Sequence, residues 1–195
     1  MEHFDVVIVG SGHGGAQAAI ALRQNGHEDT ILMVSRDRNP PYERPPLSKE
    51  YLAGEKPFER IQIRPEKFWA DKNVELRLGR NVNEVDPIAR ELVLSDDTRI
   101  TYRKLIWAAG GDARRLSCPG SDLGSIHYVR TRRDVDTLKE ELAGGAKRAV
   151  IVGAGYIGLE LGIAYRKLGC DVEFIEALDR ILPLYDTELV RPISM

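Results

Sequence analysis

A glycine-rich turn near the start of the chain constrains its fold more than any other feature. Residues 5–15, DVVIVGSGHGG, begin with an apolar run of the length that suits a buried parallel strand. Gly10, Gly12 and Gly15 follow at G-x-G-x-x-G spacing, ahead of small and apolar residues that suit a helix packed close to a sheet. The N-terminus of that helix would offer free N–H groups and partial positive charge to phosphates. The stretch predicts a dinucleotide site, and the alternative is a glycine-rich turn in an ordinary α/β core.

The same pattern returns in residues 149–160, AVIVGAGYIGLE, where Gly153, Gly155 and Gly158 have the same spacing. The chain is therefore expected to be an α/β protein with two Rossmann-like dinucleotide-binding units. Two such units imply two dinucleotides, or one dinucleotide and a degenerate copy. Two dinucleotides in one chain favour a flavin and a nicotinamide that exchange hydride.

An acidic residue is expected near the end of the second strand of each unit, where it can accept hydrogen bonds from a ribose. Asp37 is the candidate in the first unit, although a solvated loop acid is the alternative. Glu176 is the candidate in the second unit. An acid at this place repels a 2′-phosphate, so Glu176 favours NAD over NADP.

The region between the two turns carries further signals. Four prolines keep residues 39–49, NPPYERPPLSK, extended, and they position Arg44 for a pyrophosphate and Lys49 for a flavin edge. Two surface cations on a loop are the alternative. The remaining elements are predicted as short helices at residues 47–52 and 66–72, a β-meander at 74–101, and a separate strand at 105–111 whose small residues lie against a cofactor.

A linker is predicted at residues 117–125, which places a domain boundary between residues 116 and 117. Residues 1–116 would form the N-terminal part of one nucleotide-binding domain, and residues 117–195 that of a second. In the second, a helix at 130–143 would be capped by Thr131 or Asp134. Its next helix would bury the stripe Ile157, Leu161, Ala164 and Leu168.

Composition narrows the remaining function classes. The net charge of −2 gives no general attraction to nucleic acid or an anionic membrane. The two cysteines do not form a C-x-x-C pair, so no metal site is predicted. The sequence shows no membrane-spanning apolar run and no basic leader, so a cytoplasmic protein is expected.

Four segments, VVIVGSGHGG, PYERPPLSK, WAAGGDAR and VIVGAGYIGLE, together resemble the FAD-dependent ferredoxin reductases of oxygenase systems. This is the putidaredoxin reductase and apoptosis-inducing factor type of the pyridine nucleotide-disulfide oxidoreductases. The resemblance implies FAD and NAD as cofactors, hydride transfer from NADH to the flavin, and single electrons passed to a ferredoxin-type iron–sulfur protein.

The resemblance also implies site residues. Lys49 and Glu160 would act as a catalytic pair beside the flavin. Relatives often have an acid where this chain has Arg36, which leaves Asp37 to carry the ribose contact. The implied FAD contacts are Gly10, Gly12, His13, Gly14, Gly15, Ala16, Arg36, Asp37, Arg44, Lys49, Val82, Ala109, Gly110, Arg114 and Glu160. The implied nicotinamide nucleotide contacts are Gly153, Gly155, Tyr156, Ile157, Gly158 and Glu176.

Two departures bear on these expectations. The segment ERPPLSKEYL lacks the cysteine pair of disulfide-reducing relatives, which agrees with electrons leaving singly. The family's chains are longer, so the second domain is expected to be incomplete at its C-terminus, and exposed core faces favour a homo-oligomer. The alternatives are a rubredoxin reductase or NADH-oxidase type of enzyme, and a nucleotide-binding fragment without turnover.

Overall fold

The computed structural model describes residues 2–192 and divides them into two compact units. The first unit comprises the described residues up to Arg44 together with Phe58–Asp112. The second comprises Pro45–Pro57 and the described residues from Ala113 onward. The domain boundary predicted between residues 116 and 117 stays a prediction. The division into compact units also places Pro45–Pro57 with the second unit, although this segment lies early in the chain.

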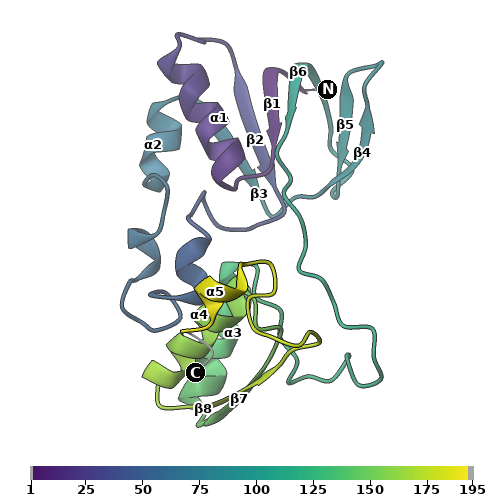
Figure 1. Ribbon diagram of the computed structural model, residues 1–195. Coiled ribbons are helices and arrows are strands. Elements are labelled where there is room, and N and C mark those ends of the chain that lie inside the picture. The colour runs from purple at the N-terminus through teal and green to yellow at the C-terminus, as the bar shows by residue number, and fades with distance from the viewer. Residues whose placement is uncertain (1, 193–195) are drawn as a thin grey trace. The chain divides into compact units, whose positions relative to one another are not determined.

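Within the described residues, the first unit holds a six-stranded mixed sheet (Figure 1). Its spatial order is β3-β2-β1-β6-β5-β4. Strands β1, β2, β3 and β6 run parallel, and β4, β5 and β6 are joined as an antiparallel meander. The strand bounds are β1 Glu2–Val9, β2 Ile31–Ser35, β3 Val74–Leu78, β4 Val82–Asp86, β5 Glu91–Leu94 and β6 Arg99–Trp107.

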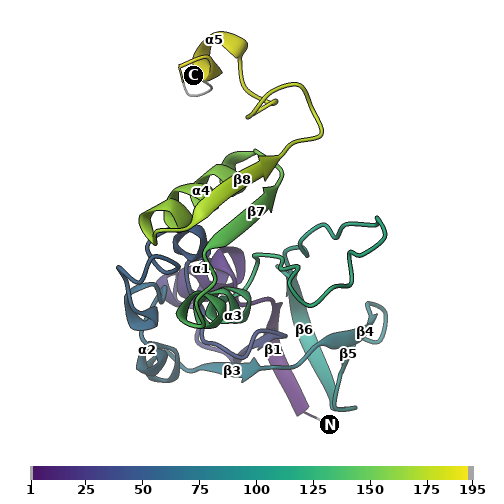
Figure 2. The same cartoon turned by 90° about the horizontal axis from the view of Figure 1, so that it is seen from below.

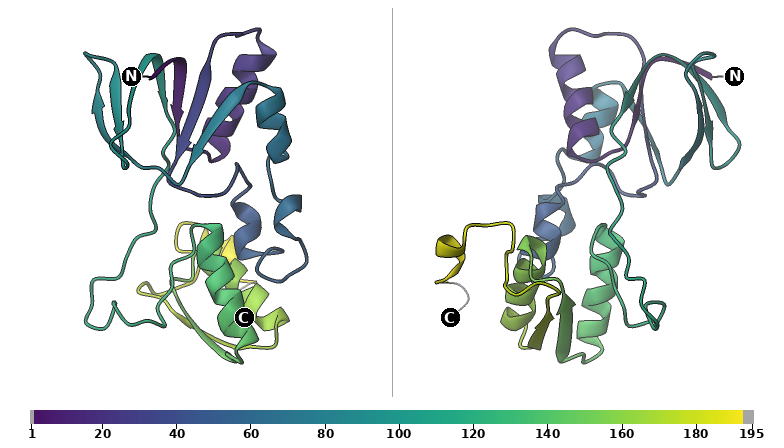
Figure 3. Two further views of the ribbon diagram at one scale, coloured as in Figure 1. Left: turned by 180° about the vertical axis from the view of Figure 1, so that it is seen from behind. Right: turned by 45° about the vertical axis from the view of Figure 1, so that its right-hand side comes forward.

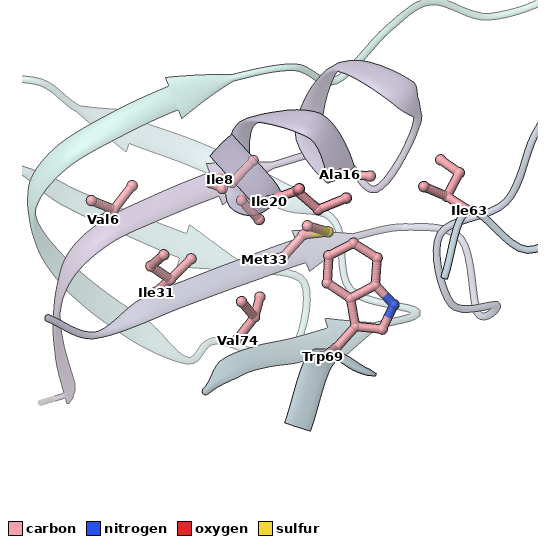
Figure 4. Close-up of a cluster of buried hydrophobic side chains, with 10 residues drawn as sticks. Val6, Ile8, Ala16, Ile20, Ile31, Met33, Ile63, Trp69 and Val74 are labelled. Carbon is pink, nitrogen blue, oxygen red and sulfur yellow. The ribbon is translucent and has the colours of Figure 1, made fainter. Parts of the chain in front are cut away.

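Both faces of the parallel strands are covered, as parallel sheets require. Helices α1 (His13–Gln24) and α2 (Glu66–Asp71) pack on one face, where Trp69 is the largest fully buried side chain (Figures 3 and 4). A second cluster joins the other face of β1 and β2 to side chains of β5 and β6, including Leu92, Leu94 and Ile100. Helix α1 ends at a C-terminal cap: Asn25 caps the helix, and Gly26 follows in the left-handed conformation with φ +78°.

The predicted meander at residues 74–101 is wrong at its first strand. β3 pairs parallel to β2, with Val74 opposite Ile31, and so extends the parallel sheet. Its alternation of apolar and charged residues suits either kind of edge strand, so the pattern did not separate the two. The end of the predicted meander and the separate strand predicted at 105–111 belong to one strand, β6, which ends at Trp107. It pairs with β1 along one edge and with β5 along the other.

The second unit contains a parallel pair of strands, β7 (Arg148–Val152) and β8 (Asp171–Ile175), with Ile151 opposite Phe174. Helix α4 (Tyr156–Lys167) lies along this pair (Figure 2). The 3-10 turn η1 (Pro45–Ser48), helix α3 (Arg132–Ala143) and the short helix α5 (Thr187–Val190) complete the unit. The predicted cap of α3 is confirmed as a capping box, in which Thr131 and Asp134 bond each other's backbone N–H.

The predicted buried stripe on α4 is only partly correct. Ile157 is 57% exposed, whereas Ala164 is buried together with Gly162. A Cβ at Gly162 would lie 2.4 Å from the Phe174 ring, so the helix approaches β8 through its glycine rather than through a row of large side chains. A periodicity that counts apolar side chains misses such a contact.

No helix within residues 2–192 combines the length and the apolar character needed to cross a bilayer.

Candidate functional site

The first glycine turn joins β1 to α1 and has a closed side and an open side. Gly10 adopts φ +109°, and a Cβ there would lie 2.1 Å from the carbonyl oxygen of Ala108. A Cβ at Gly15 would lie 1.9 Å from the carbonyl oxygen of Gly10. A Cβ at Gly12, by contrast, would meet nothing within 4 Å. The turn is therefore packed on the side of the protein and open at Gly12.

Helix α1 begins at this open side without a group that would neutralise its N-terminus. Gly12 is the N-cap and makes no side-chain cap bond, and the first turn contains no acidic residue. The exposed residues His13 and Gly14 lie in that first turn, where N–H groups have no intrahelical acceptor. Ala16 is fully buried and its N–H donates to Gly12, so it supports the turn from within. The arrangement fits a pyrophosphate.

The second glycine turn repeats this geometry between β7 and α4. Gly153 adopts φ +99°, and a Cβ at Gly158 would lie 2.0 Å from its carbonyl oxygen. Gly155 caps α4 without a side-chain bond and faces open space. Tyr156 and Ile157 follow in the first turn of α4 and are mostly exposed.

Glu176 lies directly after β8 and is bonded to the second glycine turn. Its carboxylate accepts the backbone N–H of Ala154 at 2.7 Å and that of Leu178 at 3.1 Å. These backbone bonds lower the pKa of Glu176, with the Ala154 bond the largest cause. The structure thus places an anionic carboxylate beside the turn, where the ribose acceptor was predicted.

Asp37, the predicted acceptor of the first unit, is engaged within its own loop. One carboxylate oxygen accepts the backbone N–H of Asn39 at 3.1 Å and its side-chain amide at 2.9 Å. The other accepts the Tyr42 hydroxyl at 2.7 Å and lies 3.6 Å from the Arg44 guanidinium. Asp37 and Arg44, both predicted site residues, are thereby brought together.

Arg36 precedes this loop and forms an ion pair with Asp112. Asp112 lies beyond Ala109 and Gly110, on the segment that follows β6, and residues 109–112 are exposed. Val82 is the first residue of β4. Gly79 and Arg80, which precede that strand, donate to the carbonyls of Asp37 and Ser35. Arg114 is exposed in the second unit.

The second unit brings together the predicted catalytic pair. The Lys49 ammonium lies 2.9 Å from one carboxylate oxygen of Glu160 on α4. The Ser48 hydroxyl donates to the other oxygen at 2.6 Å. Glu160 is mostly buried and Lys49 is partly exposed. The buried carboxylate therefore fixes the position of an ammonium group that solvent can reach. The contact forms because η1 packs on α4.

Sequence reasoning missed four polar residues at these sites. Ser11, in a variable position of the first turn, is buried and donates to Ser35 at 2.7 Å. Ser35 in turn accepts the N–H of Asp37 at 3.2 Å, which links the glycine turn to the loop after β2. For Ser48, the only sequence feature that pointed to the site was its neighbour Lys49. For Asp112, no sequence feature pointed to the site, because its partner Arg36 is distant along the chain.

Comparisons with known proteins agree with this geometry. The family model described as pyridine nucleotide-disulphide oxidoreductase matches residues 4–194. The chain is 58% identical over 180 residues to a ferredoxin–NAD(P)(+) reductase of a Sphingomonas species, covering 92% of this chain and 43% of the relative. It is 54% identical to the ferredoxin reductase subunit of a 5,5'-dehydrodivanillate O-demethylase from a Sphingobium species, covering 93% of this chain and 44% of that protein.

Among solved structures, the chain resembles the covalent putidaredoxin reductase–putidaredoxin complex with a TM-score of 0.90 at 31% sequence identity. That match covers 100% of this chain and 47% of the solved chain. The chain therefore spans less than half the length of these relatives.

Proposed function

Because the chain belongs to the pyridine nucleotide-disulphide oxidoreductase family, we propose that it carries the cofactor-binding turns of an FAD-dependent NADH:ferredoxin reductase. FAD would bind at the glycine turn of the first unit, and NADH at that of the second. The single observation that carries this proposal is the geometry that the two turns share: Gly15 or Gly158 is packed against the carbonyl of the turn's first glycine, and the turn is open at Gly12 or Gly155. The similarity of the chain to proteins named as ferredoxin reductases supports it.

The residues of each unit fit these two ligands in different ways. The first turn offers His13 and Gly14 amides to a pyrophosphate, with Arg44 as a further cation near Asp37. In the second unit, the anionic Glu176 would accept hydrogen bonds from the ribose of NADH and disfavour a 2′-phosphate. This residue supports NAD rather than NADP.

When bound, FAD supplies the change from two-electron exchange with a nicotinamide to single-electron transfer. The chain's own contribution would be electrostatic. Lys49, held by Glu160, offers a fixed positive charge that stabilises negative charge on an electron-rich ring. Ser48 fixes the second oxygen of Glu160, so the carboxylate cannot rotate away from the ammonium without losing a bond.

We further propose that the electron acceptor is a ferredoxin-type iron–sulfur protein, that the protein acts in the cytoplasm, and that it forms a homo-oligomer. The names of the relatives support the acceptor. The exposed apolar side chains Val150, Val152 and Ile175 of the second unit support self-association.

The test is a visible absorption spectrum of the chain after incubation with FAD and removal of free flavin, recorded before and after NADH is added. A flavin spectrum that bleaches with NADH is expected. A chain that keeps no flavin would contradict the assignment of the first turn and favour a binding module without turnover. A bound flavin that NADH does not bleach would contradict the assignment of the second turn. Steady-state assays with a ferredoxin, a rubredoxin and a dye would then distinguish the acceptor.

A further inference from the structure

The Arg36–Asp112 ion pair spans the edge of the sheet at which the first glycine turn lies. Arg36 directly follows β2, and Asp112 lies on the segment after β6. β1 lies between β2 and β6 in the sheet and runs parallel to both. The carboxyl ends of the three strands therefore meet at one edge, and the pair joins the two loops on either side of β1.

The segment that carries Asp112 is held against the glycine turn. The N–H of Ala108 donates to the carbonyl of Val9 at 2.8 Å. The Ala108 carbonyl occupies the space that a Cβ at Gly10 would need, and the Ala108 methyl lies 3.8 Å from a Cβ built at Gly14. From this anchored start, the chain reaches Arg36 on the side of β2. Asp112 is thereby held beside the turn although it is far from it in sequence.

A ribose acceptor has to be accessible, and the two candidate carboxylates differ in this respect. The Asp37 side chain is 8% exposed, and both of its oxygens are bonded within its own loop. The Asp112 side chain is 75% exposed, and that of Arg36 is 51% exposed. A carboxylate offers about four lone-pair positions, and the exposure of Asp112 makes its carboxylate reachable for the hydroxyl groups of a ligand.

We propose that Asp112, oriented by Arg36, is the carboxylate that accepts hydrogen bonds from the adenosine ribose of the dinucleotide in the first unit. Asp37 is then a positioning residue that shapes the loop between Arg36 and Arg44. This inference rests on the proposed function, in which the first unit binds FAD. The ribose acceptor is then Asp112, on the segment that follows β6, rather than Asp37, which follows β2.

The experiment measures the affinity of the full chain for FAD and for the FAD analogue that contains 2′-deoxyadenosine. Flavin binding is followed by quenching of the fluorescence of Trp107, which is exposed at the end of β6. Asp112→Asn is expected to weaken FAD binding about tenfold, as the loss of one charge-assisted hydrogen bond predicts. It should also remove most of the preference for FAD over the analogue, because that preference measures the hydroxyl contact itself.

Matched variants separate binding from structure. Arg36→Ala should reduce the same preference in part, and Asp112→Glu should retain part of it. Asp37→Asn should weaken the binding of FAD and of the deoxy analogue by the same factor, because Asp37 shapes the loop and does not contact the 2′-hydroxyl group. Asp71→Asn removes a partner of the exposed Lys67–Asp71 pair on α2 and should change nothing. Tryptophan-detected unfolding of every variant confirms that it is folded.

If Asp112→Asn prefers FAD over the analogue as strongly as the wild-type chain does, this inference is overturned and the proposed function still stands. Loss of the preference in Asp37→Asn alone would overturn it as well. Wild-type chain that binds neither probe would overturn the proposed function, and this inference with it.

Discussion

Gly12 and Gly15 lie in the same turn but are required for different reasons, which mutation can separate. Gly15→Ala would place a methyl group against the carbonyl of Gly10, so we expect it to destabilise the first unit by about 1–3 kcal/mol. Gly12→Ala meets no atom of the protein and should change stability by less than about 0.5 kcal/mol. Urea unfolding followed by tryptophan fluorescence gives both values.

The same two variants differ in ligand binding. Gly12→Ala should weaken FAD binding at least tenfold, because the added methyl group occupies the open side where the pyrophosphate would lie. A Gly12→Ala chain with wild-type FAD affinity would place the phosphates elsewhere.

Lys49 is expected to act through its charge. Lys49→Ala should weaken FAD binding or slow flavin reduction by NADH, whereas Lys49→Arg should retain part of both properties. Lys56→Ala, which removes the partner of the neighbouring Glu50, is the matched control. The occupancy of flavin and the rate of bleaching are the measurements, and unchanged values of both would contradict a role for the pair.

Glu176 should determine affinity for NADH without affecting FAD. Glu176→Gln is expected to weaken NADH binding. Glu173→Gln, which changes an exposed acid three residues earlier that pairs with Arg148, should have no effect. Equal NADH affinities for wild type and Glu176→Gln, measured by titration, would remove the residue from the site.

The lowered pKa of Glu176 also fixes the pH dependence of this affinity. A carboxylate whose pKa is depressed stays ionised above that pKa, and its contribution is lost only as the pH falls through it. NADH affinity should therefore be constant from neutral pH down to the ordinary glutamate pKa of about 4.3 and decline below it. A decline that began near pH 6 would assign the effect to another group.

Single residues were predictable where local pattern or resemblance named them. The glycine spacing located both turns, and the resemblance paired Lys49 with Glu160, which lie 2.9 Å apart. The prediction of Asp37 rests on its place near the end of the second strand. That place does not reveal that Asn39 and Tyr42 bond to its oxygens, or that Asp112 reaches Arg36 from the segment after β6.

Helix α3 begins at a capping box formed by Thr131 and Asp134. Thr131→Ala removes the acceptor for the N–H of Asp134 and should cost about 1 kcal/mol of unfolding free energy in the second unit. Thr137→Ala, in the middle of the same helix, removes only a bond back to the carbonyl of Arg133. It should cost less than about 0.5 kcal/mol. Urea unfolding followed by far-ultraviolet circular dichroism compares them, and equal costs would contradict the role of the cap.

Helices and strands were predictable where a sequence pattern is compatible with only one kind of element. The two strand–turn–helix units and the helix α3 followed from glycine spacing and capping residues. β3 was assigned to the wrong ladder because its alternating sequence fits a parallel or an antiparallel edge equally well. β6 was divided in two because its pairing with β1, which holds the whole strand together, is not visible in the strand's own residues.

The whole molecule offers a spectroscopic separation of its two units. Both tryptophans, Trp69 and Trp107, lie in the first unit. FAD is expected to raise the midpoint of the thermal transition seen by tryptophan fluorescence, by mass action on the unit that binds it. NAD should raise the transition seen by circular dichroism more than that seen by fluorescence. A shift of the fluorescence midpoint with NAD and none with FAD would reverse the assignment of the two turns.

Chain order has a consequence for biosynthesis. Pro45–Pro57 belongs to the second unit, where Tyr51 donates to Asp136 of α3 and Ser48 donates to Glu160 of α4. A ribosome that adds about 5–20 residues per second makes this segment roughly ten seconds before α4. During that interval, Tyr51 lacks its later partners on α3, and the η1 turn lacks the helices α3 and α4 on which it packs. The nascent chain therefore exposes the apolar side chains of Pro45–Pro57 to solvent until α3 and α4 have been translated and can cover them.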